Sequence, residues 1–143
     1  MKYPSDKSQL AFPIAECEFT PETGFSYVTI VTPYGRFTGT AQVHPEDMEK
    51  NYFSSFSGQS IAHLRAYIEY LKYMKNLKIY TRLEMMRCWA TAKKKNPTSA
   101  ALAKRIEELD EEITEYRFAI ADLKDLINEK IDKLEKYYKA RNE

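Results

Sequence analysis

The last third of the chain carries an apolar pattern with steps of three and four residues, interrupted by neither glycine nor proline. Such a heptad seam is typical of a helix that packs lengthwise against another helix. Its members are Ile106, Leu109, Ile113, Tyr116, Ile120, Leu123 and Ile127. After Ile127 an extra step of four leads to Ile131, Leu134 and Tyr138, a stutter that locally relaxes a supercoil. We therefore expect a long helix over residues 99–139.

A second stretch without glycine or proline, Ser60 to Lys95, precedes this helix. Its apolar residues also recur at helical spacing: Ile61, Leu64, Ile68, Leu71 and Met74, and then Leu83, Met86 and Ala90. We expect a long helix over 60–95, either continuous or bent near Asn76. Pro97 ends it, because the residue before a proline resists the helical conformation. Two such helices joined by a short turn predict an antiparallel helical hairpin.

The first part of the chain has strand character. Phe25–Thr32 is rich in β-branched and aromatic residues, and the turn Pro33-Tyr34-Gly35 follows it. In the next run Phe37, Gly39, Ala41 and Val43 share one face, and the small Gly39 and Ala41 suggest close approach by a helix. With an earlier strand near Ile14–Phe19, residues 8–43 predict an antiparallel β meander. The predicted fold is α+β, a single domain over 1–143 that forms homo-oligomers through its helices.

Composition restricts the partners. The 22 basic and 21 acidic residues give a net charge of +1, which disfavours a nucleic-acid polymer as partner because such binding depends on neutralising phosphates. No apolar run is long enough to span a membrane, and the N-terminus lacks the apolar core of a signal peptide. Cys17 and Cys88 do not have metal-site spacing and are expected to be reduced thiols.

Motifs for catalysis or for a cofactor are not apparent. His44, Glu46 and Asp47 are close in sequence, but the only other histidine is His63 and the spacing matches no zinc motif. The acidic run Glu107–Glu112 is typical of a solvated helix face. The four glycines are scattered and form no phosphate-binding loop. We expect no enzymatic activity, no metal and no cofactor, with an enzyme that uses His44 as the weakest alternative.

Arginines beside aromatic residues are the best candidates for a binding site. Arg65 lies in a largely apolar stretch, Arg82 and Arg87 lie near Trp89, and Arg117 lies between Tyr116 and Phe118. A guanidinium group can hold a phosphate with two hydrogen bonds while a flat ring stacks on a base. The alternative for each arginine is an ordinary ion pair with one of the acidic residues.

Two local motifs give the chain a family resemblance. The segment Phe37–Asp47 (FTGTAQVHPED) is followed by an aromatic loop, Gly58 and Ile61–Ala66 (IAHLRA). This run resembles small proteins from phages of Gram-positive bacteria, in particular the first Thoeris anti-defence family of phage sponge proteins. The resemblance spans roughly residues 25–120. It implies a non-enzymatic protein that sequesters cyclic ADP-ribose isomers (glycocyclic ADP-ribose) made by a defensive TIR enzyme. Some members of that family also capture cyclic trinucleotides at a second site formed by oligomerisation.

The resemblance also implies site residues and a location. It puts the phosphate-binding arginines at Arg65 and Arg117, the stacking aromatic residue near Trp89, and the polar residues of the helix turn at Thr98 and Ser99. Tyr116, beside Arg117, completes the candidate site, which would lie at a subunit interface in the host bacterial cytoplasm. A coiled-coil module that binds a host protein is the alternative, since the heptad seam alone would suit that function equally well.

Overall fold

The computed structural model describes residues 12–51, 53–92 and 98–142. Three strands come first, β1 (Ile14–Thr20), β2 (Phe25–Thr32) and β3 (Gly35–Gln42), and three helices follow, α1 (Pro45–Lys50), α2 (Ser55–Ala92) and α3 (Thr98–Asn142). The strands form one antiparallel sheet in the order β1-β2-β3. The predicted α+β class, with a β meander before long helices, is confirmed.

The described residues belong to two compact units, and α2 and α3 each contribute to both. The sheet unit contains the three strands, α1, the part of α2 up to Tyr70 and the part of α3 from Ala121. The helical unit contains α2 from Leu71 and α3 up to Ile120. The single domain of the sequence analysis stays a prediction.

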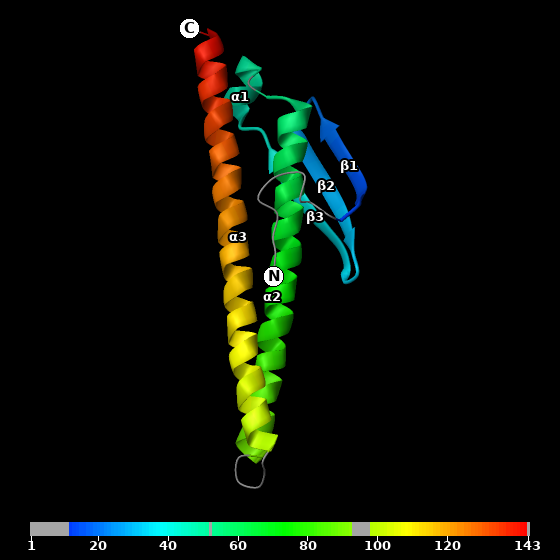
Figure 1. Cartoon of the computed structure of the whole chain (residues 1–143). Coiled ribbons are helices and arrows are strands. Elements are labelled where there is room, and N and C mark those ends of the chain that lie inside the picture. Colours follow the sequence, from blue (N-terminus) through cyan, green and yellow to red (C-terminus); the bar gives the residue numbers. More distant parts are fainter. Residues whose placement is uncertain (1–11, 52, 93–97, 143) are drawn as a thin grey trace. The chain divides into compact units, whose positions relative to one another are not determined.

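The sheet follows from the alternation along its strands. Val28 on β2 pairs with Gly39 on β3, and Ile30 pairs with Phe37. Val28, Ile30, Gly39 and Ala41 are buried, whereas the alternate residues on β3 are exposed. The shared face predicted for β3 is therefore the core face. Figure 1 shows α2 running along this sheet in its first half.

Two glycines allow α2 to lie close to the sheet. A Cβ atom at Gly39 would overlap the backbone of α2 at the carbonyl of Ala62 and the amide of Ala66. A Cβ atom at Gly58 would likewise collide with the buried hydroxyl of Ser26 on β2. The predicted close approach of a helix to Gly39 is thus correct. Because α2 lies this close to the sheet, its residues Ile61, Ala62, Leu64, Ala66 and Ile68 are all buried.

Helix α1 occupies a segment for which the sequence pattern predicted no helix. The His44 ring caps this helix, because its Nδ1 accepts a hydrogen bond from the amide of Glu46 at 3.2 Å. Pro45 occupies the first turn with Glu46 and Asp47, which suits the positive end of the helix dipole. Asn51, with φ of 58°, ends the helix in the left-handed conformation.

Helix α2 begins earlier than expected, at Ser55 rather than Ser60. The hydroxyl of Ser54 accepts a hydrogen bond from the amide of Ser57 at 3.1 Å, which satisfies one of the free amides of the first turn. The helix then continues through Asn76 without a break. Among the described residues, no helix has the length and apolar content needed to cross a membrane.

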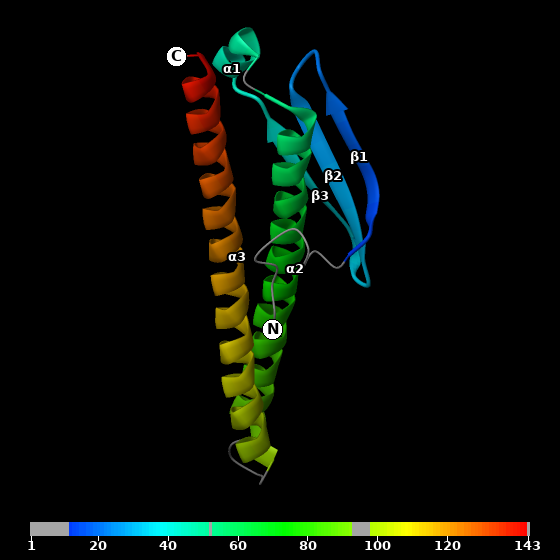
Figure 2. The same ribbon diagram turned by 45° about the horizontal axis from the view of Figure 1, so that its top comes forward.

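In the helical unit the predicted seam of α3 is buried from Leu109 onward, whereas its first member, Ile106, is half-buried. Leu109, Ile113, Tyr116 and Ile120 are each less than a tenth exposed. The antiparallel register against α2 is marked by two ion pairs, Lys78 with Glu112 at 3.4 Å and Arg82 with Asp110 at 2.5 Å. Figures 1 and 2 both show the two helices of this unit side by side.

The apolar stripe of α2 does not follow its partner as predicted. The stripe is buried as far as Met74, but Leu83 is 49% exposed and Met86 is 38% exposed. After Met74 the spacing of the apolar residues shifts, so that the later ones face away from α3. This leaves an exposed apolar strip on the helical unit.

Candidate ligand-binding site

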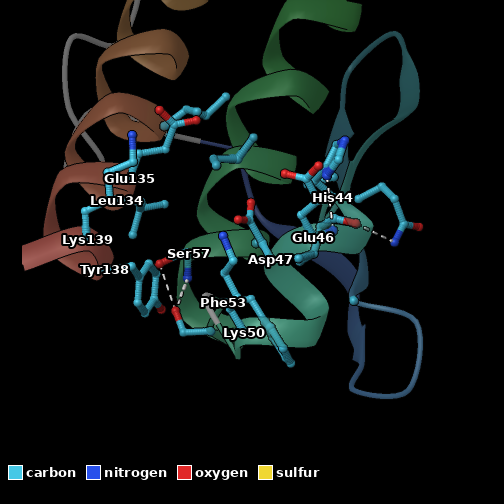
Figure 3. Close-up of a pocket in the computed structure, with 18 of the residues that line it drawn as sticks. His44, Glu46, Asp47, Lys50, Phe53, Ser57, Leu134, Glu135, Tyr138 and Lys139 are labelled. Atoms are coloured by element: carbon cyan, nitrogen blue, oxygen red, sulfur yellow. Dashed lines mark hydrogen bonds between the residues drawn. The ribbon is translucent and has the colours of Figure 1, made fainter. Parts of the chain in front are cut away.

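A cavity of about 480 Å³ lies within the sheet unit. Its walls come from the end of β3, from α1, from the first three turns of α2 and from the C-terminal turns of α3. Figure 3 shows Tyr138 and Lys139 on the α3 side, His44 and Glu46 on the opposite side, and Lys50 between them. The volume lies within the usual range of small-molecule sites, which is roughly 300–1,000 Å³.

The lining combines charged, aromatic and apolar groups. The basic side chains are Lys50, Arg65 and Lys139, and the acidic ones are Glu46, Asp47 and Glu135. Phe53 and Tyr138 supply aromatic rings. The apolar part of the wall is formed by Ala41, Val43, Ile61, Ile131 and Leu134. Such a wall suits a ligand that carries anionic, hydroxyl and flat apolar parts together.

Arg65 is fixed in the cavity wall by the sheet. Its Nη1 donates a hydrogen bond to the carbonyl oxygen of Thr40 on β3 at 2.9 Å. The residue is half-buried and stands in a stretch of α2 whose other members, from Ser60 to Ile68, are all buried. One bond to the backbone uses only part of the five-donor guanidinium fork, so the group keeps donors that can meet a phosphate oxygen.

The start of α2 contributes polar backbone to the same cavity. Ser54, Ser57 and Gly58 all line it. The Ser54 hydroxyl donates to the Ser57 hydroxyl at 2.8 Å, so these two side chains orient each other. The first amides of a helix point along its axis away from the helix body and favour negative charge. The start of α2 therefore adds to the attraction that the basic side chains exert on an anionic ligand.

The C-terminal part of α3 forms the remaining wall. Leu123 and Ile127 are 1% and 4% exposed, whereas the next seam positions, Ile131, Leu134 and Tyr138, are only half-buried. All three line the cavity. The stutter predicted after Ile127 thus marks the point at which the seam changes from a packed core to a cavity wall.

The six residues predicted as a site divide between the two units. Arg65 lies in the sheet unit and lines the cavity. Trp89, Tyr116 and Arg117 lie in the helical unit, where Trp89 is half-buried, Tyr116 is buried and Arg117 is exposed. Thr98 and Ser99 form the first turn of α3, and their side chains lie outside the described residues.

Within one copy of the chain, the members in the helical unit are too far apart for one small ligand. Ser99 and Arg117 are separated by about 27 Å along α3, at 1.5 Å per residue. Trp89 and Arg117 lie on opposite sides of the Arg82–Asp110 pair, about 21 Å apart along the axis by the same rise. A site that uses these residues together needs a second copy, so the subunit-interface site stays a prediction.

Of the residues that accompany Arg65, the sequence pattern drew attention to His44, Glu46 and Asp47 but not to the basic and aromatic side chains. Tyr138 was recognisable as a seam position, but nothing in the spacing indicates that the seam opens there. Lys50, Phe53 and Lys139 come from elements distant in the sequence, and only the fold brings them to one cavity. His44 also lines the cavity, where its ring caps α1.

Other features of the described residues point to no further chemistry. Among them, no three histidine, cysteine, aspartate or glutamate side chains gather as a metal site requires. Cys17 and Cys88 are both exposed thiols. Comparisons of the chain with models of protein families, with curated protein sequences and with solved structures gave no match.

Proposed function

We propose that this protein binds and sequesters a small cyclic nucleotide signal, a cyclic ADP-ribose isomer, in the cavity of the sheet unit. The function would be phage anti-defence without cleavage of the ligand, in the host cytoplasm. One observation carries the proposal: Arg65, which the family resemblance assigns to phosphate binding, lines the cavity of the sheet unit, as do Lys50 and Lys139. The resemblance supplies the ligand class, and the cavity supplies a place of suitable size.

The lining residues match the parts of such a ligand. Lys50, Arg65 and Lys139 can pair with the two phosphates through charge-assisted hydrogen bonds, which are about twice as strong as neutral ones. The rings of Phe53 and Tyr138 offer flat surfaces for adenine. The carboxylates of the cavity can accept hydrogen bonds from ribose hydroxyls.

Sequestration requires tight, stoichiometric binding and slow release rather than turnover. Heating the loaded protein until it unfolds should therefore return the ligand chemically intact, as judged by chromatography and mass spectrometry. Recovery of a hydrolysed product would show that the protein is an enzyme.

We further propose that the chain forms a homo-oligomer through the helical unit. On this unit Tyr80, Leu83, Met86 and Phe118 are between 38% and 64% exposed. The described part of α2 in this unit carries five basic side chains and one acidic one, whereas α3 up to Ile120 carries three basic and six acidic ones. A second copy placed with its α3 against this α2 would bury the apolar strip and match opposite charges.

Titration calorimetry with cyclic ADP-ribose isomers tests the function. The unsubstituted protein should bind at least one isomer at submicromolar concentration, and Arg65→Ala should weaken binding by about 100-fold, since a lost charged contact costs about 2–5 kcal/mol. Arg36→Ala, on the exposed face of β3, is the matched control and should bind normally. No heat with any isomer would overturn the proposal and favour a protein-binding helical module instead.

Arg117→Ala separates the cavity from the subunit interface. If the cavity alone binds the ligand, this exposed arginine of the helical unit can be removed without loss of affinity. A loss equal to that of Arg65→Ala would instead indicate a composite site between copies. Native mass spectrometry of the same samples gives the number of subunits, and Leu83→Glu should lower it without changing the helix content.

A further inference from the structure

The C-terminal turns of α3 are built unlike the rest of that helix. From Leu109 to Ile127 the seam residues are buried, with exposures of 8% or less. Beyond Ile127 the seam positions Ile131, Leu134 and Tyr138 remain apolar or aromatic but are only half-buried. All three line the cavity, so this stretch of the seam faces the cavity.

All the cavity residues of this stretch lie on one face of α3. Ile131, Leu134, Glu135, Tyr138 and Lys139 recur at alternating steps of three and one, which places them on one side of a helix with 3.6 residues per turn. The intervening Lys133, Lys136 and Tyr137 are exposed and do not line the cavity. The cavity-facing stripe is therefore distinct from the solvent-facing side of the same turns.

The rest of the cavity wall combines the apolar residues Ala41, Val43 and Ile61 with charged side chains. Helix α1 contains no buried residue, and its side chains at the cavity are Glu46, Asp47 and Lys50. A ligand with both charged and flat parts could therefore contact α1 and the end of α3 at once.

We propose that residues 131–139 of α3 form a ligand-binding clamp, in which Tyr138 stacks on the base and Lys139 pairs with an anionic group. The inference rests on the proposed function, because it concerns the same cavity. It goes further by assigning binding to a segment that the family resemblance leaves without a role. It also predicts that ligand binding stabilises the last turns of α3 within the sheet unit.

Paired variants of adjacent residues test the clamp by calorimetry with cyclic ADP-ribose isomers. Tyr138→Ala should weaken binding by about 10-fold or more, as the loss of base stacking on an aromatic ring does elsewhere, and Tyr138→Phe should restore it. Tyr137→Ala removes the same ring one position away, where it is 56% exposed, and should change affinity less than about 3-fold. Lys139→Ala should likewise weaken binding, because it removes a charge at the cavity. Lys136→Ala removes a charge outside the cavity and is its control.

Hydrogen exchange provides a readout that does not depend on affinity. With saturating cyclic ADP-ribose isomer, the amides of the last three turns of α3 should exchange at least about 10-fold more slowly, while those of the helical unit stay unchanged. The Tyr138→Ala variant, loaded at higher ligand concentration, should show less of this protection. Circular dichroism of each variant checks that the helix content is retained.

These experiments distinguish failure of the clamp proposal from failure of the proposed ligand-binding function. Tight binding by the unsubstituted protein with no effect of Tyr138→Ala or Lys139→Ala, and no protection of the end of α3, would overturn the clamp and leave the proposed function standing. Equal losses for Tyr137→Ala and Tyr138→Ala would also overturn it, because the effect would then be a general loss of helix stability. No binding by the unsubstituted protein would overturn both.

Discussion

In the helical unit the seam of α3 is buried from Leu109 to its end at Ile120, whereas in the sheet unit it is buried only as far as Ile127 and then borders a cavity. In the helical unit the seam positions from Leu109 to Ile120 are buried and ion pairs lie beside them. In the sheet unit α2 is buried against strands, and the end of α3 lines the cavity. The same apolar repeat thus forms a packed core in one part of α3 and a cavity wall in another. The structure that faces the repeat decides which of the two it forms.

A seam residue of α3 therefore has no fixed energetic role. Leu123 and Leu134 are the same residue type at equivalent steps of one helix, yet Leu123 is 1% exposed and Leu134 is half-buried at the cavity. We expect Leu123 to stabilise the fold, because it is packed in the core. We expect Leu134 to contribute to ligand binding instead, because it lies on the cavity wall.

The largest effect is expected where the sheet and α2 meet. Gly39→Val should destabilise the protein by more than about 3 kcal/mol, because the new side chain would overlap the α2 backbone at Ala62 and Ala66. Thr40→Val, at the next and exposed position of β3, is the control and should cost less than about 1 kcal/mol. Urea unfolding followed by circular dichroism measures both. Equal stability of the two variants would contradict the close packing of β3 on α2.

Two seam leucines of the sheet unit test where the seam changes from packed core to cavity wall. Leu123→Ala should lower the free energy of unfolding by about 2–4 kcal/mol, the usual cost of a cavity in a packed core. Leu134→Ala should lower it by less than about 1 kcal/mol, because this side chain already borders a cavity and remains partly exposed. Similar losses at both positions would mean that the end of α3 is packed like the rest of the seam.

A buried phenol ties the chain before β1 to α2. The amide of Phe12 donates a hydrogen bond to the Tyr67 hydroxyl at 2.6 Å, and Tyr67 is 4% exposed. Tyr67→Phe should therefore cost about 1 kcal/mol in unfolding experiments at neutral pH. Tyr70→Phe serves as a control, since it retains the ring that packs on Phe12 at 4.9 Å.

The same phenol gives a pH signature. Burial raises the pKa of Tyr67 above its ordinary value of 10.0, and the hydrogen bond from Phe12 partly offsets this. The folded state then holds the proton more tightly than the unfolded state, so this stabilisation is complete below pH 10 and is lost as the pH rises further. The deficit of Tyr67→Phe relative to the unsubstituted protein should shrink above pH 10. A constant deficit would contradict the raised pKa.

The smallest effect is expected at the ion pairs of the helical unit. The side chains of Arg82 and Asp110 are 32% and 53% exposed, so Asp110→Asn should cost less than about 1 kcal/mol. That cost should fall further in high salt, because salt screens exposed charges. Thermal melts at low and high salt measure it. A loss of about 2–4 kcal/mol, the usual cost of a cavity in a packed core, would mean that charge pairs, rather than the seam, hold this unit together.

The sequence by itself determined the elements and most of their faces. Period-two alternation located the strands, the shared face of Gly39 and Ala41 indicated a helix close to β3, and the heptad seam located α3 with its change after Ile127. These properties are local, because they depend on residue type and spacing along one element. The same local logic misplaced the start of α2 and missed α1, since caps such as His44 and Ser54 act through side-chain bonds that spacing does not reveal.

Only the tertiary structure decided what each face meets. It turned Leu83 and Met86 outward, although they continue the apolar stripe of α2, and it opened the seam of α3 at Leu134 and Tyr138. It also brought Lys50, Arg65 and Lys139 from three helices to one cavity. A periodic pattern states that a face is apolar, but the partner of that face depends on contacts between residues far apart in the chain. The site therefore belongs to the fold rather than to any motif.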